Sequence, residues 1–190
     1  MAKIRAFIAI EIPEETKKGL KRLLETLKTL CPIKAISWSK PETMHVTIKF
    51  LGDIEDADIE KISRTLQEAA KHATEFDITA KGIGAFPSPK SPRVVWVGID
   101  GSGALKSLHA AIDKGLAQLA IPKNDKPFSP HLTLCRVREK AAGKGIREAI
   151  EKPDVKFEAA WKVTEITLFK SALKPDGALH TPLSTVKLGG

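Results

Sequence analysis

The chain has 190 residues, of which 42% are hydrophobic and 28% charged, a balance typical of a soluble globular protein with a sizeable core. This composition argues against extensive disorder, and we expect a single domain over residues 1–190. No run of about 18 or more apolar residues is present to span a bilayer. The apolar run that begins at Ala6 stops at Glu11 without a signal-peptide cleavage site. We therefore expect a cytoplasmic protein with no membrane partner.

The chain carries a formal net charge of +8. This charge favours polyanionic partners such as RNA, because lysine and arginine release condensed counterions when they neutralise phosphates. Lysine-rich surfaces also serve solubility and thermal stability, so charge alone leaves both interpretations open. Cys31 and Cys135 are too few for a disulfide framework and have no metal-ligand spacing. We expect both cysteines to be reduced packing residues.

The chain is predicted to begin with a strand and a helix. Lys3–Glu11 has the pattern of a strand, and Pro13 followed by two glutamates suits the start of a helix. Leucines then recur at helical spacing until Cys31-Pro32, where the proline disfavours helical geometry in the residue before it. In chain order, the further predicted elements are strands at Ala35–Ser39 and His45–Leu51, a helix with Ile59, Ile62, Leu66 and Ala70, strands at Phe76–Ala80 and Arg93–Ile99, a helix with Leu105, Leu108, Ile112, Leu116 and Leu119, a strand at His131–Val137, a weaker helix at Lys140–Glu151, a strand at Val163–Phe169 and a short strand near Thr185–Leu188.

Several of these strands follow one another too closely for parallel crossovers, so an antiparallel α+β arrangement fits best. Asp56 and Ser102 are predicted as the polar starters of the second and third helices.

Two segments repeat one short pattern. His45-Val-Thr-Ile-Lys-Phe50 and His131-Leu-Thr-Leu-Cys-Arg136 share His-h-Thr-h, where h is apolar, and stand 86 residues apart. A lone histidine on a strand is more often structural than catalytic, but a doubled motif favours catalysis.

Side-chain alternation along a strand predicts which residues share a face. In the first motif, His45, Thr47 and Lys49 are predicted on one face, with Lys49 a solvated residue at its rim. In the second motif, the same rule places His131, Thr133 and Cys135 on one face. Two sheets could thus present two His-x-Thr pairs toward each other.

Paired imidazoles suit in-line displacement at phosphorus, in which the nucleophile loses a proton on one side while the leaving oxygen gains one on the other. One neutral and one protonated histidine can do both near neutral pH, because the ordinary histidine pKa is about 6.5. The hydroxyls of Thr47 and Thr133 could donate to the non-bridging phosphate oxygens. We predict His45 and His131 as catalytic, with the two threonines assisting and with neither metal nor cofactor.

In this framework the sequence resembles the two-histidine phosphoesterases, and among them the archaeal and bacterial RNA 2′,3′-cyclic phosphodiesterases first named 2′-5′ RNA ligases. The resemblance covers almost the whole chain and rests on Arg5–Ile10, His45–Gly52, Gly84–Pro87 with Pro92–Gly98, Phe128–Leu134 and Val163–Ser171. It implies an α+β, bilobal fold with pseudo-two-fold duplication. Two antiparallel sheets would face a central cleft that holds both histidines, with helices outside.

The resemblance also implies an activity and further site residues. The expected reaction is hydrolysis of RNA 2′,3′-cyclic phosphate ends, such as those of tRNA fragments, to 2′-phosphomonoesters, with 2′-5′ ligation as the reverse reaction, by a monomeric enzyme. Arg136 and Arg93 are expected to contact the substrate phosphate. Strict alternation would place Arg136 on the apolar face, so its contact requires a bend or bulge. His180 stands where the family often has a tyrosine.

Other interpretations remain open on the sequence alone. The histidines could be ligands of a metal-dependent phosphoesterase, although no third ligand with a recognisable spacing accompanies them. The chain could be a non-enzymatic basic RNA-binding protein, although no RNA-recognition or KH signature is present. His72 and His109 are interpreted as helix-surface or packing residues. Three tryptophans are interpreted as core anchors rather than a base-stacking platform: Trp38, Trp96 and Trp161.

Overall fold

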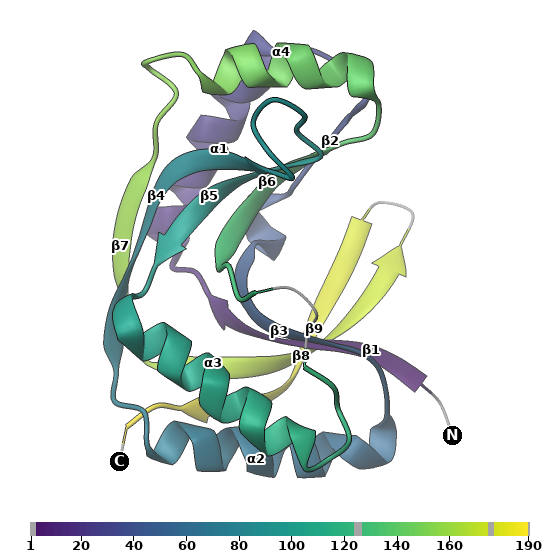
Figure 1. Cartoon of the computed structure of the whole chain (residues 1–190), viewed down its shortest axis with the longest axis vertical. Coiled ribbons are helices and arrows are strands. Elements are labelled where there is room, and N and C mark those ends of the chain that lie inside the picture. The colour runs from purple at the N-terminus through teal and green to yellow at the C-terminus, as the bar shows by residue number, and fades with distance from the viewer. Residues whose placement is uncertain (1–2, 124–126, 175–176, 190) are drawn as a thin grey trace.

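The computed structural model describes residues 3–123, 127–174 and 177–189 (Figure 1). Within these ranges the elements are, in chain order, β1 (Lys3–Glu11), α1 (Glu14–Leu30), β2 (Ile36–Trp38), a 3₁₀ turn (Pro41–Thr43), β3 (His45–Glu55), a 3₁₀ turn (Asp56–Asp58), α2 (Ile59–Lys71), β4 (Phe76–Phe86), β5 (Val94–Asp100), α3 (Ser102–Ala117), β6 (His131–Val137), α4 (Lys140–Ile150), β7 (Glu158–Val163), β8 (Glu165–Lys174) and β9 (Gly177–Lys187).

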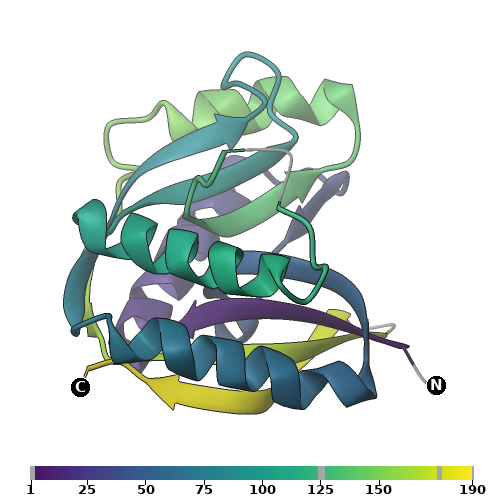
Figure 2. The ribbon, with the colours of Figure 1, turned by 60° about the horizontal axis from the view of Figure 1, so that its bottom comes forward.

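The strands form two antiparallel sheets. Sheet A has the order β3-β1-β8-β9, and sheet B has the order β2-β6-β5-β4-β7. Helices α2 and α3 pack together beside sheet A, and α1 and α4 pack together beside sheet B (Figures 1 and 2). Each sheet therefore has an outer face covered by helices and an inner face turned toward the other sheet. The predicted α+β fold with two antiparallel sheets and outer helices is confirmed.

The two halves of the chain repeat one arrangement. The run β1-α1-β3-α2-β4 is matched by β5-α3-β6-α4-β8, and the order β3-β1-β8-β9 in sheet A is matched by β6-β5-β4-β7 in sheet B. The first helix of each half packs on the opposite sheet, since α1 contacts α4 and α3 contacts α2. This exchange joins the two helix layers through one continuous hydrophobic core.

Most predicted elements are confirmed, with corrections at the C-terminal end. β7 was not predicted, because Glu158–Val163 is short and contains two adjacent alanines, which have low strand propensity and bury little surface. β9 is longer than the predicted strand near Thr185–Leu188 and includes Pro182. Proline is tolerated there because β9 lies at the edge of its sheet. The predicted capping positions of Asp56 and Ser102 are wrong, because the N-cap residues of α2 and α3 are Asp58 and Gly101.

A β-bulge interrupts both strands that begin with a repeated histidine. In β3, Thr47 pairs with Ala9 and Lys49 with Ile8, so Ile48 is the extra residue. In β6, Thr133 pairs with Trp96 and Cys135 with Val95, so Leu134 is extra. An extra residue reverses the side-chain alternation of the residues that follow it, and in β3 a second extra residue, Leu51, restores the original alternation.

The bulges overturn two of the predicted orientations. Lys49 and Cys135 are buried on the outer faces, against the helices, instead of sharing the inner face with the histidines. Burial, aided by the nearby Cys31, raises the pKa of Cys135 to about 12. Both cysteines are free and buried, as predicted.

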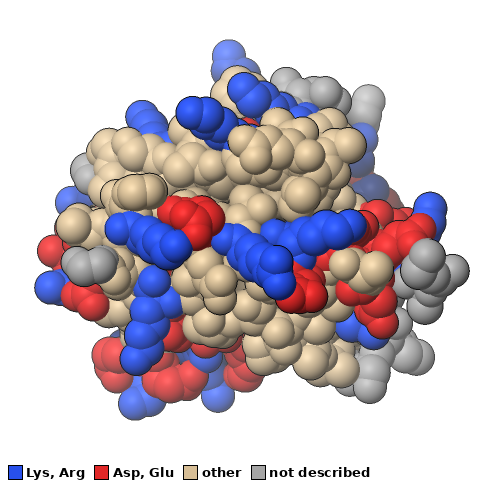
Figure 3. Space-filling model, turned by 90° about the horizontal axis from the view of Figure 1, so that it is seen from below, with Lys and Arg blue, Asp and Glu red and all other residues tan. Residues whose placement is uncertain are grey.

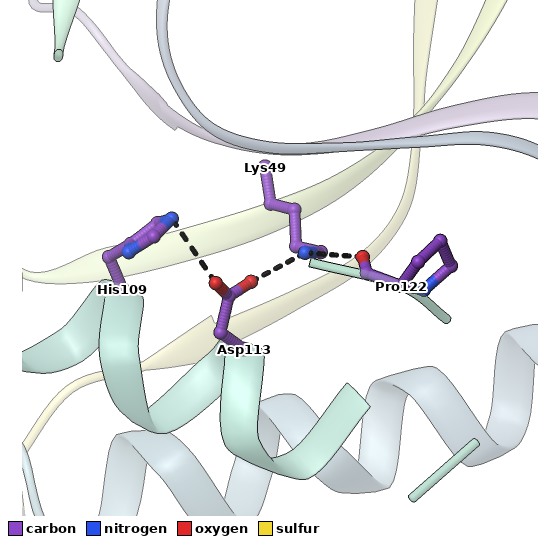
Figure 4. Close-up of polar contacts among 4 residues, drawn as sticks. All are labelled: Lys49, His109, Asp113 and Pro122. Carbon is purple, nitrogen blue, oxygen red and sulfur yellow. Dashed lines mark hydrogen bonds and ion pairs between the residues drawn. The ribbon is translucent and has the colours of Figure 1, made fainter. Parts of the chain in front are cut away.

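Lys49 is therefore not a solvated rim residue (Figure 4). Its side chain has no exposed surface, and its ammonium group donates to Asp113 of α3 at 2.5 Å and to the carbonyl of Pro122 at 2.9 Å. Asp113 also lies 3.8 Å from His109, whose ring stacks on Phe128 at 4.0 Å. This network joins β3 to α3 and to both ends of the segment that leads into β6.

We expect Lys49→Met to destabilise the protein strongly. Methionine fills a similar volume, but Asp113 then lies in a largely buried site without its cation, a change that costs about 3–5 kcal/mol. Denaturant unfolding measures the loss. Lys61→Met, which removes the exposed pair with Asp58, is the control and should cost less than about 1 kcal/mol. An equal effect of the two substitutions would contradict the assignment of Lys49 to the core.

Candidate active site

His45 and His131 occupy equivalent positions, each at the first residue of its strand. His45 Nδ1 lies 3.0 Å from the carbonyl oxygen of Thr43, and His131 Nδ1 lies 2.7 Å from that of Ser129. A carbonyl oxygen can only accept, so each Nδ1 carries the hydrogen. Each Nε2 is thereby left to accept a proton when the ring is neutral, or to donate one when it is charged.

The inner faces of β3 and β6 carry the polar members of both motifs. Thr47 and Thr133 lie two residues beyond their histidines, before the bulges, and are half-buried. The two strands contact each other although they belong to different sheets. The structure thus places both His-x-Thr pairs on inner faces, in neighbouring strands.

Arg136 also lies on the inner face, because of the bulge at Leu134. Arg136 pairs with Val94 of β5. Val94 and Trp96 are two residues apart in β5, so their side chains lie on the same face of the sheet. The Trp96 ring lies 6.3 Å from that of His131, which fixes this as the histidine side of the sheet. Arg136 is exposed there. The bulge that a substrate contact by Arg136 required is therefore present.

His45 lies in an aromatic cluster. Its ring stacks on Phe7 at 4.5 Å, and Phe7 stacks on Phe169 at 5.3 Å. Phe7 and Phe169 are buried apart from the main core, on the inner face of sheet A. This burial, with a smaller contribution from His180, lowers the pKa of His45 to about 4. His45 is therefore neutral at pH 7 in the free protein.

His180, on β9, completes this cluster. Its ring meets that of His45 edge-on at 5.1 Å and that of Phe7 at 4.9 Å. Its Nδ1 is buried and has no hydrogen-bond partner among the described residues, and burial lowers its pKa. Sequence reasoning noted this residue only as a departure from the family tyrosine. His180 and His45 are 135 residues apart in the sequence, so no local sequence pattern could reveal their contact.

The surroundings of His131 correct the interpretation of Trp96. Phe86 meets His131 edge-on at 5.2 Å and lies 5.1 Å from Trp96. The Trp96 ring crosses Gly84 so closely that a Cβ there would lie 2.3 Å from it. Trp96 therefore lines the candidate site instead of anchoring the core. Trp38 and Trp161 pack on the core as predicted.

The side chain of Arg93 faces a second pocket, outside the aromatic groups around the two histidines. It lines a pocket of about 290 Å³ between the β4–β5 loop and α4, together with Lys90, Lys144 and Arg147. Its backbone N–H donates to the carbonyl of Phe86 at 2.7 Å. Its predicted contact with a substrate phosphate stays a prediction.

Two structural features are not found among the described residues. No group of three or more His, Cys, Asp or Glu side chains is arranged to hold a metal ion in the described part of the chain. No helix within the described ranges is long and apolar enough to cross a membrane.

Relatives of known family share this chain's length and fold. RNA 2′,3′-cyclic phosphodiesterases of Aquifex aeolicus and Archaeoglobus fulgidus are 33% and 31% identical, covering 100% and 95% of this chain and 100% and 98% of theirs. A crystal structure of a Thermus thermophilus protein matches with a TM-score of 0.80 at 27% identity, covering 97% of this chain and 98% of its own. Escherichia coli LigT complexed with 3′-AMP matches in fold, with a TM-score of 0.80 at 24% identity over 98% and 99% of the two chains.

The duplication seen in the fold is also present in the family model. The model described as LigT-like phosphoesterase matches residues 10–96 and again residues 97–180, and the boundary falls within β5. Each match contains one His-x-Thr motif. The chain therefore belongs to the LigT-like phosphoesterase family and is homologous over its full length to RNA 2′,3′-cyclic phosphodiesterases.

Proposed function

We propose that this protein hydrolyses RNA 2′,3′-cyclic phosphate ends to 2′-phosphomonoesters, with His45 and His131 as its acid and base. The observation that carries the proposal is the matched pair of Nδ1 hydrogen bonds to the carbonyls of Thr43 and Ser129. Each bond orients a ring and leaves its Nε2 for proton transfer. The relatives' activity and the full-length homology support the same reaction.

In this reaction water attacks phosphorus and gives its proton to the Nε2 of the neutral imidazole. The bond to the 3′ oxygen breaks, and that oxygen takes a proton from the Nε2 of the charged imidazole. Thr47 and Thr133 lie on the same inner faces, where they can donate to the other phosphate oxygens as charge develops. Arg136 lies further along the inner face of β6, where its long side chain can contact the substrate. Attack by a 5′-hydroxyl in place of water would give the 2′-5′ ligation.

His45→Ala and His131→Ala should each lower kcat by about 10²–10⁴, because each removes one proton-transfer group. Thr47→Val and Thr133→Val should lower kcat less, since each removes a single donor. The measurement is turnover of an oligoribonucleotide that ends in a 2′,3′-cyclic phosphate, with EDTA present. His72→Ala, in a helix-end histidine outside the site, is the matched control. Near-normal turnover by either site variant would refute the paired-histidine mechanism, and loss of wild-type turnover in EDTA would favour a metal-dependent one.

The protonation of His45 should change when a phosphate binds. In the free protein, NMR titration of His45 should give a midpoint near pH 4, because burial and His180 disfavour its charged form. An anionic phosphate favours that charged form, so a bound 2′-nucleotide product should raise the midpoint. His180→Phe should also raise it by removing a neighbouring cation. A midpoint unmoved by product would place the phosphate away from His45.

The proposed geometry selects one product. A 2′-phosphate requires the acid beside the 3′ oxygen and the base in line on the opposite side, so only one pose of the sugar is productive. We expect a 2′-phosphate with little 3′ isomer. Phosphorus NMR of the product distinguishes the two ends. A predominantly 3′-phosphate product would reverse the assigned pose even if both histidines proved essential.

A further inference from the structure

Four basic side chains line a surface pocket outside the described site. Lys90 and Arg93 belong to the loop between β4 and β5, and Lys144 and Arg147 belong to α4. Ser91 also lines the pocket, and none of the described residues that line it is acidic. Figure 1 shows this loop beside α4, at the end of the molecule away from α2 and α3. The pocket therefore gathers positive charge with a hydroxyl donor, a combination suited to phosphate groups.

The charges of this pocket are only loosely neutralised. Lys144 lies 3.9 Å from Glu148, and Arg147 lies 4.0 Å from Glu151, both at the outer limit of an ion pair. On α2 the pairing is closer, as in Arg64 with Glu60 at 2.5 Å. Figure 3, seen from the side of α2 and α3, shows basic side chains interspersed with acidic ones. The two cations of α4 in this pocket are thus more loosely paired than Arg64 on α2.

The backbone connects this pocket to His131. The loop begins at Phe86, whose ring meets that of His131, and ends at Arg93, whose N–H donates to the Phe86 carbonyl. The carbonyl of Arg93 accepts from the N–H of Val137 at 2.9 Å, at the far end of β6. Between these points β6 carries the exposed Arg136 on its inner face. Basic side chains therefore follow the strand from the catalytic region toward the pocket.

The distance along this path exceeds the size of one nucleotide. Arg136 is five residues beyond His131, or roughly 16 Å at about 3.3 Å per strand residue. A terminal cyclic phosphate held at His131 could not reach the pocket as well. A cyclic phosphate occupies the 3′ end of an RNA, so the remainder of the molecule continues from the site in a single direction.

We propose that the pocket of Lys90, Arg93, Lys144 and Arg147 binds backbone phosphates of the RNA strand a few nucleotides upstream of the cyclic end. The proposal rests on the proposed function and extends it by making single-stranded RNA, rather than a mononucleotide, the preferred substrate. The pocket contributes charge and no base-edge contacts, so its contribution is independent of sequence.

The test compares two substrates and two double variants. Lys144→Gln/Arg147→Gln removes two pocket charges, and Lys106→Gln/Lys114→Gln removes two exposed charges from α3 as the matched control. The substrates are a 2′,3′-cyclic mononucleotide and an unstructured ten-nucleotide RNA with a 2′,3′-cyclic end. We expect the pocket variant to lose about tenfold in kcat/KM on the RNA and nothing on the mononucleotide. For the RNA substrate, the slope of log kcat/KM against log salt concentration should become shallower by about 1.4. This corresponds to about 0.7 for each of the two lost phosphate contacts.

Three outcomes would overturn the proposal. Equal loss on both substrates would mean that α4 acts through the fold of the site, and equal loss in both double variants would mean that net charge alone attracts RNA. An unchanged pocket variant would show that the strand leaves by another path. If the wild-type protein turned over neither substrate, the proposed function would fail by itself. Fluorescence anisotropy with a labelled 3′-phosphorylated ten-nucleotide RNA would still decide whether the pocket variant binds more weakly than the control.

Discussion

One extra residue directly after the His-x-Thr motif in each of two strands determines how this site is built. Without the bulges at Ile48 and Leu134, alternation would turn Arg136 into the core and leave Lys49 on the inner face. With them, each strand presents its histidine and threonine on the inner face and then rotates the following residues. The same device occurs at the same place in both halves. The duplication therefore preserves a backbone irregularity as well as a sequence motif.

The two halves have diverged in what surrounds each histidine. His45 lies among Phe7, Phe169 and His180, where the charged ring is desolvated and its pKa falls to about 4. His131 instead meets Phe86 and Trp96. A displacement reaction that requires one neutral and one charged imidazole is served by two histidines in unlike surroundings. Equivalent positions in the fold thus provide non-equivalent groups for the chemistry.

The buried ion pair of Lys49 and Asp113 connects the two halves at the level of packing. Lys49 follows the first His-x-Thr motif, while Asp113 and His109 belong to the helix that precedes the second. Phe128, which stacks on His109, is next to Ser129, whose carbonyl orients His131. Since α3 packs on sheet A although it follows a strand of sheet B, this helix positions the segment that leads to His131. The exchange of helices between the sheets therefore bears directly on the site.

The sequence by itself determined most of the elements and the candidate site residues. Helical leucine spacing, strand alternation and the doubled His-x-Thr motif identified α1, β3 and β6, together with His45 and His131, because these signals are local and periodic. Only the tertiary structure decided the faces of Lys49, Cys135 and Arg136, since a bulge depends on the pairing of a strand with its neighbour and leaves no mark in its own alternation. The same holds for Trp96 and His180. Their contacts with the histidines join residues distant in sequence, and the sheets bring them together only when they pack.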